Sequence, residues 1–311
     1  GISRSFWTTD IYETTNGNEV TMSKIAILTD SSCDIPQEMA EKYGIDIMSF
    51  HILLDDVDYV ERESCTNTEF YDKMRLAKGV PSTAAITPIQ FCEKYCQYVD
   101  EGYTDVIHVP INKSGSSTYN NALMAQGMLR EERPEHHMKI HLLDPHTYSM
   151  VFGWYLCEMA RKLKNGAEIS HVIQEFEKQM NCMEIILGPY SLKQMKKSGR
   201  ISAAAAVMGE LMGVRPIITL IDGKTKVESK VRGDDKVVPA MIELCKKRAD
   251  GVENFDYMIG HTNIKQAEDL EKACRKAFGK APLVVFELGG VVSANTGPDT
   301  VALVYTGHPR G

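Results

Sequence analysis

Hydroxyl-bearing and glycine-rich stretches lie beside four short apolar runs of this 311-residue chain. They comprise Thr29, Asp30 and Ser31 after the first run, Ser82 and Thr83 before a helical pattern, Ser114, Gly115, Ser116, Ser117 and Thr118 after the run DVIHVPI, and residues 289–298 near the C-terminal end. Hydroxyls and free backbone N–H groups at helix N-termini bind anions, so we expect a carboxylate or phosphate to be held between Thr83 and Ser116. The alternative is that these residues only cap helices and form turns.

Basic side chains offer two further places for an anion. His261 follows the run YMIG, at a position where a strand would end. Arg200 ends the segment KKSGR, and its guanidinium fork suits a carboxylate or phosphate, although a solvated turn is the alternative. Motifs of dinucleotide binding, P-loop, zincin and serine hydrolase chemistry are missing from the sequence, so catalysis lacks sequence support.

The composition excludes several classes of protein. With 43% hydrophobic and 25% charged residues, the chain is typical of a globular protein and not of a disordered or collagen-like one. Its net charge of −7 lacks the basic excess of a protein that binds nucleic acid or an anionic bilayer. No uncharged apolar run approaches the ~18 residues of a membrane span. We therefore expect a cytoplasmic monomer with no nucleic acid partner and no membrane insertion.

The sulfur-containing residues carry two further indications. The 16 Met, against 2 Trp and 9 Phe, indicate a flexible apolar lining somewhere in the molecule. The eight cysteines form no C-x-x-C pair, so they are expected to be reduced thiols. Cys92 and Cys96 would share one helix face and could supply half of a metal site, but no second pair stands at ligand spacing, so we predict no metal and no cofactor.

Short β-branched runs alternate with amphipathic helical patterns from Met22 onward, which predicts an α/β fold with parallel or mixed sheets flanked by helices. In the first half we expect strands at 24–30, 45–54, 105–111 and 139–144, and helices that begin after the capping residues Thr66 and Thr87 and near Tyr148. In the second half we expect a helix from Ile169, a strand at 184–187, a hairpin turning at Asp222-Gly223, helices at 234–248 and 264–278, and strands at 257–260, 283–288 and 301–305.

The same pattern suggests how the chain divides into domains. A boundary near Gly166 gives two α/β domains of similar size, residues 22–165 and 166–311. Residues 1–21 are polar and aperiodic, and we expect them to be a leader outside the fold.

Taken in order, the loops resemble those of the DegV family of bacterial fatty-acid-binding proteins. The segment KIAILTDSSCDIP is similar to the family's first strand and Thr-Asp-Ser start, PSTAAITPIQF stands at its Thr-Ser-Gln-Pro motif, and SGSSTYNNA stands at its Ser-Gly-Thr-Tyr segment. LLDPHTYSMVFG, KKSGRIS and VRPIITLIDGKTKVESKVRG resemble later family segments in the expected order. The resemblance extends from Met22 to the end of the chain.

The resemblance implies a two-domain carrier, not an enzyme, which binds one long-chain fatty acid in an apolar pocket between its domains. The family's carboxylate contacts correspond to Thr83, Ser116 and Asn295 here, and the supporting loops contain Thr29, Asp30, Ser31, Ser114, Ser117, His261 and Gly297. Some members hand the acid to a fatty acid kinase, which makes acyl phosphate for phospholipid synthesis. A kinase is therefore an expected partner, with Arg200 and Arg232 as candidate contacts.

The final loop, VVSANTGPDTV, departs from the family pattern. Asn295 stands where the family has His, and an amide never carries a positive charge, so a charge-assisted contact of about 1 kcal/mol is expected to be lost. Burial of an acyl chain supplies roughly 0.8 kcal/mol per methylene. The candidates for its pocket are Ile86, Ala203, Ala204, Val207, Met208, Leu211, Met212, Ile217 and Ile218, which would otherwise be ordinary core.

Two other classes of function stay open. A small-molecule phosphotransferase or acyl-transfer enzyme could use the hydroxyl-rich loops, but it would need a nucleophile–base pair or a metal-binding carboxylate cluster. A lipid-responsive sensor or scaffold would instead pass on the lipid status to another protein.

Overall fold

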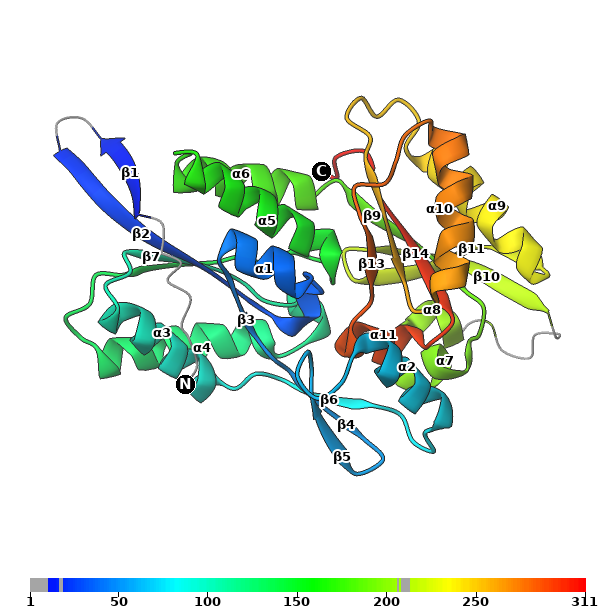
Figure 1. Cartoon of the computed structure of the whole chain (residues 1–311), viewed down its shortest axis with the longest axis horizontal. Helices are drawn as coiled ribbons and strands as arrows, with labels where there is room; N and C mark the ends of the chain where they lie inside the picture. The colour runs from blue at the N-terminus through cyan, green and yellow to red at the C-terminus, as the bar shows by residue number, and fades with distance from the viewer. Residues whose placement is uncertain (1–10, 17–18, 206, 208–212) are drawn as a thin grey trace.

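The structure, a computed structural model, describes residues 11–16, 19–205, 207 and 213–311 (Figure 1). Within these residues the chain forms two larger sheets and one three-stranded sheet, flanked by helices. The predicted α/β class with parallel and mixed sheets is therefore confirmed.

The first sheet is built on β2 (Glu19–Asp30), which pairs in parallel with β3 (Ile45–Met48) and with β7 (Asp105–Val109); β7 pairs in turn with β8 (Lys139–Leu142). Side chains alternate across a strand, so Ile25 and Ile27 enter one apolar core while Ala26 and Leu28 enter the other. In Figure 1, α1 (Gln37–Tyr43) and α5 (Met150–Lys164) lie above this sheet, and α3 (Pro88–Asp100) and α4 (Thr118–Glu132) lie below it.

An antiparallel hairpin extends this sheet at its N-terminal end. Strand β1 (Ile11–Asn16) pairs with residues 19–24 of β2. The expectation that residues 1–21 lie outside the fold is therefore corrected for residues 11–16 and 19–21, which are in strands. Their pairing is confined to the hairpin, which projects from the sheet in Figure 1.

A three-stranded sheet connects the two halves. It consists of β4 (His51–Leu54), β5 (Val57–Val60) and β6 (Ser82–Ala84), so the single strand expected at 45–54 is two strands in different sheets. Helix α2 (Asn67–Leu76) lies between β5 and β6 in the sequence and begins, as predicted, after Thr66, whose side chain accepts a hydrogen bond from the Glu69 N–H. In Figure 1 this helix lies with the second half of the molecule.

The second large sheet has the strand order β11-β10-β9-β14-β12-β13. Its strands are β9 (Met183–Pro189), β10 (Val214–Ile221), β11 (Lys224–Arg232), β12 (Tyr257–His261), β13 (Val285–Glu287) and β14 (Thr300–Thr306). The hairpin at Asp222-Gly223 is confirmed, with both residues at positive φ. Helices α9 (Val237–Arg248) and α10 (Ile264–Phe278) enclose a core on one face of this sheet.

The other face shares its core with the first sheet, because Ile27 of β2, Leu156 of α5 and Leu187 of β9 belong to one apolar cluster. Gly166, where we expect the domain boundary, lies between α5 and α6 (Ile169–Met180), which pack together.

The remaining elements are short. They are the 3-10 turns η1 (Ser31–Cys33), η2 (Lys113–Gly115) and η3 (Asp234–Lys236), and the helices α7 (Lys193–Ser198), α8 (Ser202–Ala205) and α11 (Gly290–Thr296). The stretch expected to be a glycine-rich final loop is thus mostly the helix α11.

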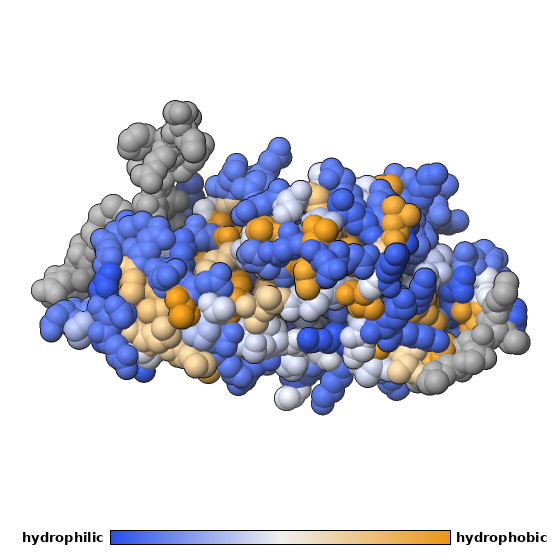
Figure 2. All heavy atoms as spheres, turned by 90° about the horizontal axis from the view of Figure 1, so that it is seen from below, coloured by the Kyte–Doolittle hydropathy of each residue, from blue (hydrophilic) through white to orange (hydrophobic). Residues whose placement is uncertain are grey.

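Figure 2 shows the face that lies below the sheets in Figure 1, where apolar atoms are interspersed among hydrophilic ones. Exposed large apolar side chains include Leu53 on β4, Ile89 on α3, and Leu123 and Met124 on α4. Among the described helices, none combines the length and the apolar character needed to cross a bilayer.

Candidate functional site

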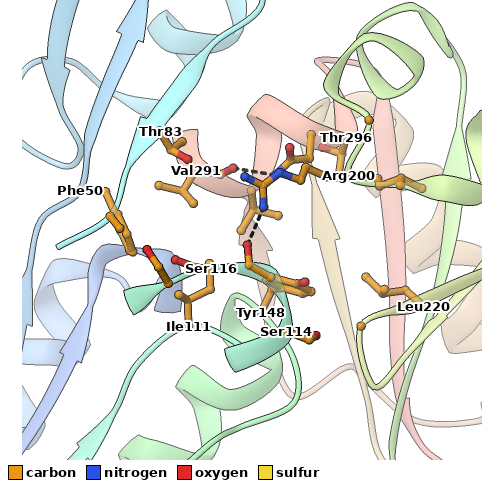
Figure 3. A pocket seen from close by; sticks show the side chains of 18 residues that line it. Phe50, Thr83, Ile111, Ser114, Ser116, Tyr148, Arg200, Leu220, Val291 and Thr296 are labelled. Atoms are coloured by element: carbon orange, nitrogen blue, oxygen red, sulfur yellow. Dashed lines mark hydrogen bonds between the residues drawn. The ribbon is translucent and has the colours of Figure 1, made fainter. Parts of the chain in front are cut away.

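A cavity of about 380 Å³ lies between the two halves of the molecule (Figure 3). The first half contributes Phe50, Thr83, Ala85, Ile111, residues 114–117 and Tyr148 to its wall. The second half contributes residues 199–201, Leu220, Gly223, Val291, Val292, Asn295 and Thr296. Such a volume falls within the range of small-molecule sites, about 300–1,000 Å³.

Hydroxyl groups from two elements line one side of the cavity. Thr83 is placed by β6, where it pairs with Ile52 of β4. Ser116 follows η2, and its Oγ lies 2.8 Å from Thr118 Oγ1 and accepts a hydrogen bond from the Thr118 N–H at 3.2 Å. The structure therefore brings together Thr83 and Ser116, the two residues between which we expect an anion, with Ser114 and Ser117 beside them.

Helix α11 forms another part of the wall. Asn295 lies in its last turn, where Nδ2 donates to the Val291 carbonyl at 3.2 Å. An amide has two N–H groups and a carbonyl oxygen, so one donor and the acceptor of Asn295 are left for a ligand. The position expected to contact the head group thus lines the same cavity as Thr83 and Ser116.

Arg200 is the only charged side chain among the described residues that line the cavity. Its Nη1 donates to the carbonyl of Gly115 at 2.6 Å, which connects the second half to the loop that carries Ser116 (Figure 3). A Cβ on Gly115 would lie 2.5 Å from the hydroxyl of Tyr148, so this loop approaches Tyr148 closely. Burial raises the pKa of Tyr148, and its hydroxyl oxygen accepts a hydrogen bond from Asn112 Nδ2 at 3.2 Å.

The lining therefore combines one cation with several hydroxyls and apolar side chains. Phe50, Ile111, Ile201, Leu220, Val291 and Val292 supply the apolar part. No Asp or Glu lies among the described lining residues, so the electrostatic environment favours an anionic group over a cationic one. An amphiphile with an anionic head satisfies both kinds of surface.

The predicted loop at Thr29, Asp30 and Ser31 does not line the cavity. It lies behind the lining and contacts one of the lining residues. All three residues are fully buried. Thr29 Oγ1 donates to the Val109 carbonyl, and Asp30 Oδ2 accepts from the N–H of Ile111, a lining residue, at 2.7 Å. Burial raises the pKa of Asp30 to about 6.

Three other predicted positions also lie away from the cavity lining. His261 ends β12 and lines a separate groove beside α10 and α2, and burial lowers its pKa. Gly297 ends α11 at a positive φ of 82° and packs against Gln194. Arg232 is exposed at the end of β11 and does not line the cavity that contains Arg200.

Residues predicted to line an acyl-chain pocket lie in the cores around the cavity. Met208, Leu211 and Met212 lie outside the described residues. Ile86 is in the core below the first sheet, Ala203, Ala204 and Ile218 are in the core shared by the sheets, and Val207 is buried after α8. Ile217 belongs to the core under α9 and α10, whereas Ile218 belongs to the core shared by the sheets, because adjacent strand residues face opposite sides.

Several lining residues were not among the predicted site residues. Phe50 lies between β3 and β4, Ile111 follows β7, and Tyr148 precedes α5. The signal for Ile111 and Tyr148 was available, since both lie at the carboxyl side of predicted strands, next to hydroxyl-rich segments. The place of Phe50 in the lining was not predictable, because it depends on a break between β3 and β4. The sequence shows only one continuous apolar run there.

These features define an α/β protein with a cavity between two sheet-containing halves. The chain belongs to the DegV family: the family model described as "Uncharacterised protein, DegV family" matches residues 24–307. It is similar to a DegV domain-containing protein of Clostridium perfringens, with 28% identity over 91% of this chain and 99% of that one.

Solved structures of the family have the same fold. A fatty acid binding DegV family protein from Streptococcus agalactiae has a TM-score of 0.79 and 26% identity, covering 93% of this chain and 100% of that chain. A stearic acid-binding protein from Eubacterium ventriosum has a TM-score of 0.83 and 23% identity, covering 91% and 98% of the two chains.

Proposed function

We propose that this protein binds one long-chain fatty acid in the cavity between its halves. The carboxylate lies against Thr83, Ser116 and Asn295, and the acyl chain follows the apolar part of the lining. The observation that carries the proposal is the combination, among the described lining residues of one cavity, of these three polar residues, the Arg200 cation and several apolar side chains. The similar Streptococcus agalactiae protein is described as fatty acid binding, which supports the same ligand class.

The proposed role is that of a carrier without catalysis of its own. Presentation of the bound acid to a fatty acid kinase, for acyl phosphate formation, rests on the family resemblance. We further propose that the carrier acts as a cytoplasmic monomer, and that its two domains meet near Gly166. Ile86, Ala204, Val207 and Ile218 surround the cavity in this proposal as the second layer of its apolar wall.

Native mass spectrometry of the purified protein tests the ligand directly. We expect a mass increment of one long-chain fatty acid per chain, and uptake of added palmitate or oleate after lipid removal. A protein that is empty and ignores both acids would refute the proposal.

A pair of neighbouring substitutions tests the placement of the head group. Thr83→Ala removes a hydroxyl from the cavity wall, whereas Ser82→Ala removes one from the preceding residue of β6, which does not line the cavity. A neutral hydrogen bond contributes about 1 kcal/mol, so Thr83→Ala should weaken binding about fivefold and Ser82→Ala should leave it unchanged. Equal effects of the two substitutions would place the carboxylate elsewhere.

A further inference from the structure

Two buried carboxyl groups of the first half lie against the start of α11. Asp34 follows η1 and is 8% exposed; Glu61 follows β5 and is 6% exposed. Neither lines the cavity, and no step of the proposed binding uses them.

Both carboxyl groups accept hydrogen bonds from backbone N–H groups of α11. Asp34 accepts from Gly289, the N-cap residue, and also from the hydroxyl of Ser149. Glu61 Oε1 accepts from Val291 at 3.4 Å, and its Oε2 accepts from Ser31 Oγ at 2.7 Å. The first turn of α11 is therefore held by side chains that lie far from it in the sequence.

The fit between these groups is close. A Cβ on Gly289 would overlap the carboxylates of both Asp34 and Glu61, and a Cβ on Gly290 would lie 2.6 Å from Ile52 Cδ1. Ser149 is held at φ 61°, in a region that non-glycine residues rarely adopt, while its N–H donates to Ser32 at 2.9 Å. Because the start of α11 is tightly packed, the helix can adopt only one position against the first half.

The far end of α11 carries Asn295 and Thr296 into the cavity. From this geometry we infer that Asp34 and Glu61 are positioning residues of the lipid site: they fix α11 so that Asn295 lines the same cavity as Thr83 and Ser116. The inference rests on the proposed function, because it assigns these residues a role in fatty acid binding.

The pair is also sensitive to pH. Burial raises the pKa of Asp34, and burial together with the charge of Asp34 raises the pKa of Glu61. Other titratable or charged groups near the pair are Asp30, Cys33, Arg62, Tyr71 and Glu287, and the groove that Asp34 and Glu61 line also contains Glu63, Cys65 and Glu69. Of these only Arg62 is a cation. As the pH rises, the two carboxyl groups ionise together, repel each other and loosen the start of α11.

Alanine substitutions test the positioning role. Asp34→Ala and Glu61→Ala remove the acceptors. Glu63→Ala is the matched control, because Glu63 is an exposed acid in the same loop and its backbone N–H, not its carboxylate, donates to the Val60 carbonyl. We expect displacement titration of a fluorescent fatty acid by oleate to show about tenfold weaker binding for the first two variants and no change for the control. Hydrogen exchange of peptides covering 289–297 should accelerate in the same two variants.

Glu61→Gln keeps the shape of the side chain and removes its ionisation, so it tests the role without a large change in folding. We expect oleate affinity of the native protein to fall between pH 6.5 and pH 9, and this fall to be smaller in Glu61→Gln. Unchanged exchange of 289–297 in Asp34→Ala and Glu61→Ala would overturn the inference, even if the native protein binds oleate. Accelerated exchange in a protein that binds no fatty acid would instead overturn the proposed function alone.

Discussion

Replacement of Arg200 by Gln removes the one charged side chain among the described residues of the cavity wall. Arg200 is exposed and holds the Gly115 carbonyl through Nη1, which leaves further guanidinium N–H groups for a carboxylate. A charge-assisted hydrogen bond contributes about 1.5–3 kcal/mol when it is buried. Solvent screening at an exposed guanidinium lowers this to about 1 kcal/mol, so the Kd for a fatty acid should rise roughly fivefold.

The assay compares a fatty acid with the fatty alcohol of equal chain length, each displacing a fluorescent lipid at low and at moderate salt. Only the acid carries a charge, so Arg200→Gln should weaken binding of the acid and leave binding of the alcohol unchanged. Arg232→Gln is the matched control, because Arg232 is an exposed arginine outside the cavity. It should alter neither affinity.

Two results would refute this reasoning. An unchanged ratio of acid to alcohol affinity in Arg200→Gln would mean that the guanidinium does not contact the head group. An equal loss in Arg232→Gln would mean that the effect arises from the net charge of the protein and not from the cavity.

Three further predictions concern residues in or behind the cavity wall. Asn295→His should tighten binding of oleate, by up to about tenfold at pH 6 relative to pH 8, because the imidazolium restores a charge-assisted contact; equal affinity at both pH values would contradict this. Gly115→Ala should lower the thermal unfolding temperature and weaken lipid binding, because its Cβ would overlap Tyr148, and unchanged melting would contradict it. Asp30 has a folded pKa of about 6, above its ordinary 3.8, so its contribution to stability is present below pH 4 and is lost as the pH rises through 6. Across this pH range the free energy of unfolding of the native protein should fall by on the order of 3 kcal/mol because of Asp30, and Asp30→Asn should abolish that fall in denaturant unfolding experiments. An unchanged pH dependence in Asp30→Asn would contradict the assignment.

The helices were the most predictable elements, because their ends are encoded locally. Thr87 accepts from the Gln90 N–H, and the Gln90 side chain accepts from the Thr87 N–H, so α3 begins with the capping box expected from the sequence. Asn263 caps α10 through its own side chain, and Gly279 ends that helix at positive φ. The bounds of α10 match the predicted range of 264–278.

The small sheet and the helix α11 were not predictable for a different reason. β6 is three exposed residues long, and its strand geometry depends on pairing with β4. The segment 290–296 carries Gly290 and Val291, which are poor helix formers, so local propensity favours a loop. Its helix is held by contacts with Asp34 and Glu61, more than two hundred residues away, which single-sequence patterns do not reveal.

The path of the chain explains why these distant contacts converge on one site. Residues 51–84 extend from the first half and contain α2, which packs against α11. The chain then returns through β6, whose Thr83 lines the cavity. Tyr71 of α2 donates its hydroxyl to the Leu288 carbonyl, directly before the Gly289 cap. The first half therefore contributes both the hydroxyl-bearing part of the cavity wall and the groups that hold α11, which forms another part of that wall. A change in the position of α11 consequently alters the separation between Asn295 and Thr83, even though the two residues belong to different halves.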